Sequence, residues 1–397
     1  MAARQADIAI LGGGLAGGLV ALALARWRRD LRILLVDEAD HFGGNRVWTF
    51  LGSEVGRDGR ELLAPLVTAG WRGYAVRFAT HARDLPGAVY TVTSARLDAA
   101  LHRVLPNDAI LTDTRALACS AGAATLADGT RIEARAVIDA RGLRNTTALT
   151  GGWQKCLGRH LRLEAPHGLE RPILIDADLP QANGLRFLSV LPLAADELRI
   201  EDVCHGSNPN LPSATLAAQI DDYARTQGWQ VREVLAEDQG VRPVVDGGDF
   251  DAFWRANGSD TARAGMRAGL FHPFTGSTLP EAVRWALAVT RRADADGTAL
   301  ASFSRDWAER AWQRSRFARR LAAMVHAAPG PDMRVRVLEA LYRLDPQTIE
   351  RMQAGRATAT DLARLLAGAN PVPLGRALNV LAGRSAGEPL HGAGLAG

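Results

Sequence analysis

A glycine-rich segment near the N-terminus constrains the fold of this chain more than any other feature. Within residues 7–18, an apolar run at residues 8–11 is typical of a buried parallel strand, and GxGxxG spacing follows it directly. Gly12 permits a tight turn, Gly14 lets the backbone approach a pyrophosphate, and Gly17 lets the next helix pack closely on the strand. The segment therefore predicts a strand, a turn and a helix that bind a dinucleotide.

An acidic residue stands where such a site needs one. We expect residues 19–27 to form the helix and residues 31–36 the second strand. Asp37 ends that strand, about 20 residues after Gly17, where a carboxylate would bind a ribose 2′-hydroxyl. The rival interpretation is a membrane-spanning helix over the uncharged residues 8–25. The glycines and the fit to a strand-turn-helix favour the dinucleotide site.

The composition is that of a globular cytoplasmic protein. With 397 residues the chain is long enough for two or three lobes and a large core. Cys119, Cys156 and Cys204 are too far apart for a zinc knuckle or a redox pair, and we expect no metal site. A net charge of +4 spread over this length is weak support for an anionic partner, and no nucleic-acid-binding motif is present. Arg4 is the only early basic residue, so we expect no signal peptide.

The chain up to about residue 155 continues the first domain. A loop over residues 43–48, containing Gly44, leads away from the second strand and is expected near the nucleotide; an ordinary glycine loop is the alternative. A capped helix is predicted to begin at residue 93 or 94, and a hairpin is predicted to turn at residues 128–129. The next strand ends in Asp139 and Gly142, which we expect in the cofactor cleft.

The pattern changes after residue 160. Short strands over residues 172–177, 185–192 and 197–203 predict an antiparallel sheet in a second lobe, with Asn183-Gly184 as a hairpin turn. A helix over 213–227 and a strand near 239–245 follow. A glycine-rich segment then leads to a helix opened by Pro280, and most of the chain from residue 298 is predicted helical.

These elements predict an α/β fold. We expect a Rossmann-type dinucleotide-binding domain at residues 1–155 and 240–295, which is discontinuous. Residues 156–239 would form an antiparallel-sheet substrate lobe, and residues 296–397 a helical C-terminal region.

Several segments carry a resemblance to a known family. They are spread in order along nearly the whole chain, at residues 43–48, 153–158, 166–169, 175–177, 181, 184–187, 190–192, 199–202, 265–283, 341–344, 349–351 and 370–373. On these residues the chain resembles the flavin-dependent lycopene β-cyclases of bacterial carotenoid pathways. The resemblance implies a two-lobed fold like those of flavoprotein hydroxylases and geranylgeranyl reductases, with reduced FAD as cofactor and NAD(P)H as reductant. The implied substrate is lycopene, an apolar polyene whose linear ends close to β-rings by a non-redox, acid-catalysed reaction.

The resemblance makes Glu201 the candidate proton donor and Asp202 a second, more structural, acid. Burial would raise the pKa of Glu201, so that it carries a proton at neutral pH. Residues 199–203 alternate along a strand, so Glu201 and Asp202 face opposite sides, while Arg199 shares the face of Glu201 and would oppose the acid role. A Glu-Asp pair on an exposed strand edge is the alternative.

Further residues follow from the resemblance. Gly276 would lie beside the isoalloxazine, and the helix from Pro280 would stabilise a reduced, anionic flavin. Arg96 would reach the FAD phosphates, unless it is a solvated surface charge. The expected substrate-binding residues are Phe271, His272 and Phe274, with a packed or capping histidine as the alternative for His272.

The chain departs from the family pattern at three places, which bear on substrate specificity more than on flavin binding. Phe274 and Ser277 replace the usual threonine and tyrosine after the His-Pro pair. Residues 203–205 replace a threonine and an aromatic residue, and Met352-Gln353 replaces an aromatic pair.

An apolar substrate must come from a bilayer, so we expect a cytoplasmic protein held peripherally at the inner membrane. Residues 303–325 mix aromatic residues with six arginines, as an interfacial helix on anionic lipid does. A helix packed on the flavin domain is the alternative.

Two rival functions remain open from the sequence. One is a flavin-dependent monooxygenase or a polyprenyl reductase on the same scaffold. The other is a flavin-binding protein without catalysis.

Overall fold

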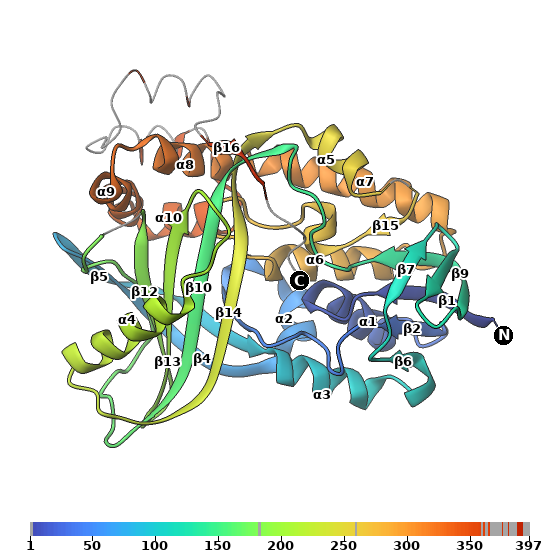
Figure 1. The fold of residues 1–397 in the computed structure, drawn as a ribbon, viewed down its shortest axis with the longest axis horizontal. Coiled ribbons are helices and arrows are strands. Elements are labelled where there is room, and N and C mark those ends of the chain that lie inside the picture. The colour runs from blue at the N-terminus through green and yellow to red at the C-terminus, as the bar shows by residue number, and fades with distance from the viewer. Residues whose placement is uncertain are drawn as a thin grey trace.

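Two β-sheets lie side by side in the computed structural model, and helices cover both (Figure 1). The structure describes residues 3–181, 184–258, 260–358, 360–361, 364–365, 375, 380 and 387–391. Asn183 of the predicted hairpin turn and residues 370–373 of the resemblance lie outside these described residues.

The first sheet contains the strand-turn-helix that the glycine segment predicts. Its strands lie in the order β6-β2-β1-β9-β8-β7, and β15 pairs with β9. The strands pair in parallel from β6 through β2 and β1 to β9, and β15 also pairs with β9 in parallel. β8 pairs antiparallel with β7 on one side and with β9 on the other, so the predicted hairpin is confirmed. The bounds are β1 (Arg4–Leu11), β2 (Ile33–Val36), β6 (Ile110–Leu111), β7 (Ala116–Cys119), β8 (Ala123–Leu126), β9 (Arg131–Asp139) and β15 (Ala262–Arg263).

The second sheet is the predicted antiparallel one, although it is larger than expected. Its order is β14-β10-β13-β12-β11-β4-β5-β3, and β16 pairs with β10. The pairs are antiparallel except that of β11 with β4. The bounds are β3 (Val47–Leu51), β4 (Val67–Phe78), β5 (His81–Thr93), β10 (Leu149–Leu163), β11 (Ile173–Asp176), β12 (Arg186–Ala194), β13 (Glu197–Gly206), β14 (Val231–Gly248) and β16 (Glu388–Pro389).

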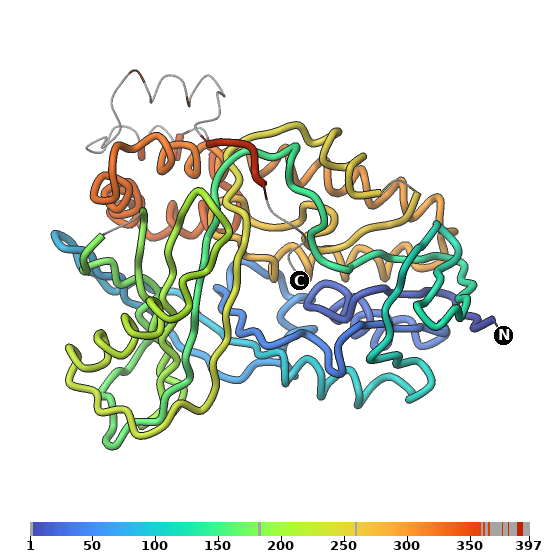
Figure 2. The backbone as a smooth tube through the Cα atoms, viewed as in Figure 1, coloured from blue at the N-terminus to red at the C-terminus, as the bar shows by residue number. Residues whose placement is uncertain are grey.

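The sheets divide the chain differently from the predicted domain boundaries. Strands β3 to β5 belong to the second sheet, although residues 1–155 were expected in the dinucleotide-binding domain. Figure 2 shows the long β4–β5 hairpin crossing from the middle of the molecule to its left-hand edge. β14 also runs across the expected boundary at residue 240. The alternation of apolar residues in a hairpin is a local pattern. Only the pairing of β4 with β11, about 100 residues away along the chain, assigns this hairpin to a sheet.

The helices form three groups around the sheets (Figure 1). Apolar residues of α1, α3, α6 and α7 pack with the first sheet. Helices α8, α9 and α10 pack with residues of the second sheet on one side, while α4 packs with that sheet through a separate apolar cluster. The bounds are α1 (Leu15–Trp27), α2 (Arg57–Leu63), α3 (Ser94–Val104), α4 (Ser213–Thr226), α5 (Phe250–Ala256), α6 (Leu279–Thr290), α7 (Gly297–Arg314), α8 (Arg316–Ala327), α9 (Pro331–Tyr342) and α10 (Pro346–Gln353).

The single helix predicted over residues 303–325 is wrong, because the chain turns at Ser315 and forms two helices, α7 and α8. Arg319 of α8 folds back so that its guanidinium lies 3.8 Å from the centre of the Trp312 ring of α7. Arg319 also donates to the backbone oxygen of Trp312. These contacts fix the bend. In the described part of the chain, no helix is both long and apolar enough to cross a membrane.

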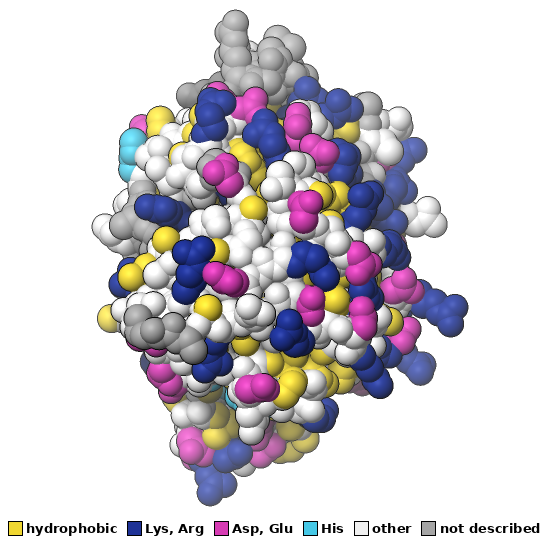
Figure 3. Space-filling model, turned by 90° about the vertical axis from the view of Figure 1, so that its right-hand side faces the viewer, with side chains coloured by type: hydrophobic (Ala, Val, Ile, Leu, Met, Phe, Trp, Pro, Cys, Tyr) yellow, Lys and Arg dark blue, Asp and Glu magenta, His cyan; other side chains and the backbone are white. Residues whose placement is uncertain are grey.

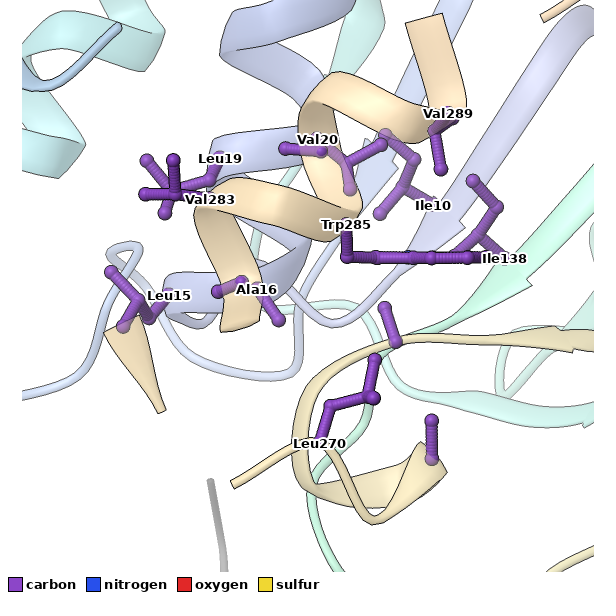
Figure 4. Close-up of a cluster of buried hydrophobic side chains, with 14 of the residues drawn as sticks. Ile10, Leu15, Ala16, Leu19, Val20, Ile138, Leu270, Val283, Trp285 and Val289 are labelled. Carbon is purple, nitrogen blue, oxygen red and sulfur yellow. The ribbon is translucent and has the colours of Figure 1, made fainter. Parts of the chain in front are cut away.

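The main core lies between α1, α6 and the first sheet. Figure 4 shows Trp285 of α6 reaching Ile138 of β9, beside Ile10 of β1. The side chains of these three residues are completely buried. The core therefore ties α6, which begins after the glycine-rich segment at residues 265–276, to the dinucleotide-binding sheet.

We expect Trp285→Ala to lower the free energy of unfolding by about 3–5 kcal/mol, because it leaves a cavity in this core. Trp27→Ala is the matched control, since Trp27 is 37% exposed and leaves no buried void. Urea unfolding of both variants measures the difference. Equal losses would contradict a core centred on Trp285.

Candidate active site

The glycine turn brings two backbone segments into direct contact. Gly12 has a φ of +100°, and a Cβ there would lie 2.7 Å from the carbonyl of Ala140. A Cβ on Gly17 would lie 1.9 Å from the backbone oxygen of Gly12. Both positions exclude a side chain. The turn therefore holds the start of α1 against the ends of β1 and β9.

Asp37 stabilises this turn. Its Oδ2 atom accepts a hydrogen bond from the backbone N–H of Gly13, and its Oδ1 accepts one from Ala39 at 2.8 Å. The backbone N–H of Gly43 donates to Gly13 at 2.9 Å and joins the loop over residues 43–48 to the same turn. The carboxylate predicted to bind ribose is thus also a structural element of the loop.

A cleft of about 600 Å³ opens at the carboxyl ends of β1 and β2. Gly12, Gly14, Asp37, Gly44 and Gly142 line it, so the structure brings five of the predicted cofactor residues together. This is the edge of a parallel sheet where nucleotides bind. The sequence did not single out four further lining residues, all arginines, at positions 115, 141, 144 and 267.

Asp139 stands behind the cleft rather than in its wall. Its carboxylate lies 2.9 Å from the guanidinium of Arg141 and 3.4 Å from that of Arg267. Burial raises the pKa of Asp139. The hydrogen bonds and positive charge of Arg141, together with the charge of Arg267, lower this pKa by more than burial raises it, so it lies below its usual value. Asp139 therefore positions two cations beside the cleft.

Gly17 and Asp139 lie next to the cleft without lining it, and two further predicted cofactor residues lie away from it. Arg96 is exposed on the first turn of α3, where its backbone N–H donates to the Thr93 side chain. Gly276, with a φ of +65°, lies between the glycine-rich segment and α6, next to the side chains of Arg242 and Gln154. Gly276 thus belongs to the interface between α6 and the second sheet.

A hollow of about 970 Å³ lies at the opposite edge of the first sheet. Six arginines are among its lining residues: Arg4, Arg26, Arg28, Arg29, Arg32 and Arg103. It includes the amino end of β1 and lies away from the carboxyl ends, where the glycine turn is. We therefore do not assign the active site to it.

Glu201 lies in a cluster of charged residues on β13 and β14. The guanidinium of Arg199 is 3.3 Å from the Glu201 carboxylate and 2.8 Å from that of Asp238. Gly158 on β10 lies opposite both acids, and a Cβ there would be 2.3 Å from Arg199. The side chains of Glu201 and Asp238 are only 19% and 12% exposed. One buried arginine therefore bridges two largely buried carboxylates.

This cluster corrects the expectation that burial keeps Glu201 uncharged. Burial does raise the pKa of Glu201, but the positive charges of Arg199 and Arg242 lower it more, and the net pKa lies below its usual value. At Asp238 burial outweighs Arg199, and the pKa is raised. Arg242, the positive charge that β14 brings to Glu201, could not be foreseen from residues 199–203 alone.

Asp202 faces the other side of β13, as the strand alternation predicts. Its carboxylate is completely buried and lies 2.6 Å from the guanidinium of Arg186 on β12. Burial raises the pKa of Asp202, and the contact with Arg186 opposes the rise. These contacts make Asp202 a structural ion-pair partner within the sheet.

An apolar cavity lies between the second sheet and helices α8 to α10. Its volume is about 90 Å³, and His272 and Phe274 line it together with His205 of β13. The backbone N–H of Thr275 donates to Nδ1 of His272 at 3.2 Å, and burial lowers the pKa of His272 to about 4, so this histidine is neutral. Phe271 lies in a second cavity of about 280 Å³, which His272 also lines.

Comparison with known proteins identifies the family. A family model described as lycopene cyclase protein matches residues 7–379. The chain belongs to the lycopene cyclase family. The lycopene β-cyclase of Pseudescherichia vulneris is 39% identical to it over 94% of this chain and 96% of the relative. That of Pantoea ananas is 39% identical over 94% of this chain and 97% of the relative.

A solved structure also supports the predicted two-lobed fold of this lycopene cyclase family member. The chain is similar to a geranylgeranyl bacteriochlorophyll reductase-like protein of Thermoplasma acidophilum, with a TM-score of 0.61 and 12% identity. The match covers 93% of this chain and 97% of that protein. At this identity the likeness concerns the fold alone.

Glu54 is a buried acid that the sequence did not single out. It lines the 280 Å³ cavity, and one carboxylate oxygen accepts a hydrogen bond from the backbone N–H of Leu51 at 2.6 Å. Burial raises the pKa of Glu54 to about 7. No motif marks this residue, because its burial depends on α6 and α7. Within the described ranges, no group of three metal-binding side chains is close enough to hold a metal ion.

We expect Asp37→Ala to weaken FAD binding by about 10- to 100-fold, because it removes a charged hydrogen-bond acceptor that also holds the glycine turn. Fluorescence titration of the apoprotein with FAD measures the change. Asp40→Ala is the control, since Asp40 is exposed and does not line the cleft. Unchanged affinity in Asp37→Ala would contradict the assignment.

Proposed function

We propose that this chain is a lycopene β-cyclase. The observation that carries the proposal is the match to lycopene cyclases over residues 7–379, with curated relatives aligned over 94% of the chain. In the reaction, a proton adds to the terminal double bond of the polyene and leaves a tertiary carbocation. The neighbouring double bond attacks this cation and closes a six-membered ring. Loss of a proton then gives the β double bond, so the net redox change is zero.

Glu201 is our candidate for the proton donor. A pKa lowered by Arg199 makes its carboxyl group a stronger acid, although fewer molecules carry the proton at neutral pH. Asp238 binds the same arginine, and burial together with the negative charge of Glu201 raises its pKa. Arg199 would then stabilise the carboxylate that remains after proton transfer.

The cleft at the glycine turn fits FAD. A Cβ on Gly12 or Gly17 would collide with backbone, which keeps the turn tight, whereas a Cβ on Gly14 would stand in open space, so the backbone at Gly14 is free for close approach of a pyrophosphate. Arg141 and Arg267, held by Asp139, would supply positive charge to the phosphates, and Asp37 would bind ribose. Bound in its reduced form, with NAD(P)H as reductant, FAD would supply negative potential near the carbocation.

Expression in a bacterium that accumulates lycopene tests this function. We expect ringed carotenoids with the wild-type chain and none with Glu201→Gln, because the amide cannot donate the proton. Glu197→Gln is the matched control on the same strand, since Glu197 is the first residue of β13 and pairs with Arg162 and His160. Chromatography of the pigments measures ring formation. A fully active Glu201→Gln variant would remove Glu201 from the mechanism.

We also propose that the protein binds the cytoplasmic side of the inner membrane through α8. Arg316 is exposed, and Arg316 and Arg320 lie 5.0 and 5.9 Å from the ring of Phe317, which lines the apolar cavity. Cations beside an apolar cavity suit anionic lipid. The face at the far end of the molecule instead carries interspersed acidic and basic side chains (Figure 3).

We expect Arg316→Glu to reduce binding to vesicles that contain anionic lipid, because it reverses a charge at the proposed contact. Arg131→Glu, at an exposed position on β9 in the other sheet, is the control. Co-sedimentation with vesicles at low and high salt measures binding. Equal binding of Arg316→Glu and wild type would contradict this orientation.

A further inference from the structure

The apolar cavity beside α8 to α10 has an unusual set of polar atoms in its wall. Four of its lining residues, Gln154, His205, His272 and Gln353, each have a buried polar atom that makes no hydrogen bond within the described part of the chain. These atoms are Oε1 of Gln154, Nδ1 of His205, Nε2 of His272 and Oε1 of Gln353. Buried polar atoms are normally paired, so four in one small cavity indicate a ligand that completes them.

The rest of the cavity wall is mostly apolar. Phe187, Phe274, Phe317 and Leu321 are among the apolar residues that line the same space. The His205 ring meets the edge of Phe274, with 5.9 Å between ring centres. A mostly apolar pocket with a few convergent polar groups is typical of a site that orients an apolar ligand by one polar substituent.

The chemistry of the four atoms limits that substituent. Both amide oxygens only accept hydrogen bonds, so the ligand must carry a donor. Burial lowers the pKa of His205 to about 3, so its ring is neutral and offers one donor and one acceptor. A hydroxyl group both donates and accepts, and it can satisfy an amide oxygen and the imidazole together. A keto oxygen only accepts and would leave both amide oxygens unpaired.

The distance between this cavity and Glu201 limits where on the ligand the hydroxyl group can lie. His205 and Glu201 lie on the same face of β13, four residues apart, which is roughly 13 Å at about 3.3 Å per residue. A hydroxyl group in the cavity is therefore not on the double bond next to Glu201. It belongs to a part of the ligand roughly 13 Å further along.

We propose that this cavity binds the hydroxyl group of a polyene alcohol, so that the chain accepts shortened or chain-hydroxylated polyenes in addition to lycopene. This inference rests on the cyclase activity proposed above. Positions at which the chain departs from the family, Phe274 and Met352-Gln353, lie in this cavity, as does His205 from the divergent segment 203–205. These positions, which are far apart in the sequence, thus meet in one cavity, whereas Ser277 lines the second cavity.

A matched pair of ligands tests the proposal. One is a linear polyene alcohol whose hydroxyl lies roughly 13 Å from its terminal double bond, and the other carries a methyl group in place of the hydroxyl. Both are titrated into the holoenzyme in detergent, with quenching of tryptophan fluorescence as the readout. We expect the alcohol to bind about tenfold more tightly or better. Equal affinity would overturn the proposal and would indicate that water pairs these atoms.

Variants of the cavity wall test whether these side chains cause the difference in affinity between the two ligands. His205→Phe and Gln353→Leu should each reduce the ratio of the two affinities towards one, whereas Gln313→Leu, at an exposed position on α7, should leave it unchanged. Circular dichroism shows whether each variant folds, and if one does not, the wild-type ratio alone decides. Ring formation from lycopene is measured separately. Its absence would refute the cyclase, while the affinity ratio still decides whether the cavity recognises a hydroxyl group.

Discussion

The backbone contact at the glycine turn determines where the rest of the molecule lies. Because Gly12 and Gly17 have no side chains, α1 approaches β1 closely and the carbonyl of Ala140 meets the turn directly. This contact aligns the carboxyl ends of β1, β2 and β9 on one cleft. The second sheet is joined to the same edge, since Asn45 in the loop after β2 donates to the Glu237 backbone of β14 at 2.7 Å.

Features that depend on local chemistry were predictable from the sequence. The glycine turn, Asp37, the Thr93 cap of α3 and the hairpin between β8 and β9 each follow from a few neighbouring residues. The opposite orientation of Glu201 and Asp202 follows from the two-residue period of a strand. Each of these features required no knowledge of which distant segment packs nearby.

Features that depend on distant partners were not predictable. The pKa of Glu201 was expected to rise, and it falls because β13 holds Arg199 over it while β14 brings Arg242 to the same face. Glu54 becomes an acid with a raised pKa only because the chain buries it against residues from α6 and α7. The break at Ser315 depends on Arg319 reaching back to Trp312, and apolar periodicity does not reveal such a contact.

The proposed chemistry is proton transfer without net redox change, and isotope incorporation measures this directly. The protein with reduced FAD is given lycopene in deuterated water without oxygen, and the products are analysed by mass spectrometry. We expect one deuterium per ring, retained at the carbon that received the proton, with no NAD(P)H consumed in proportion to product. Ringed product without deuterium, or stoichiometric loss of NAD(P)H, would contradict a carboxylic acid as the agent of cyclisation.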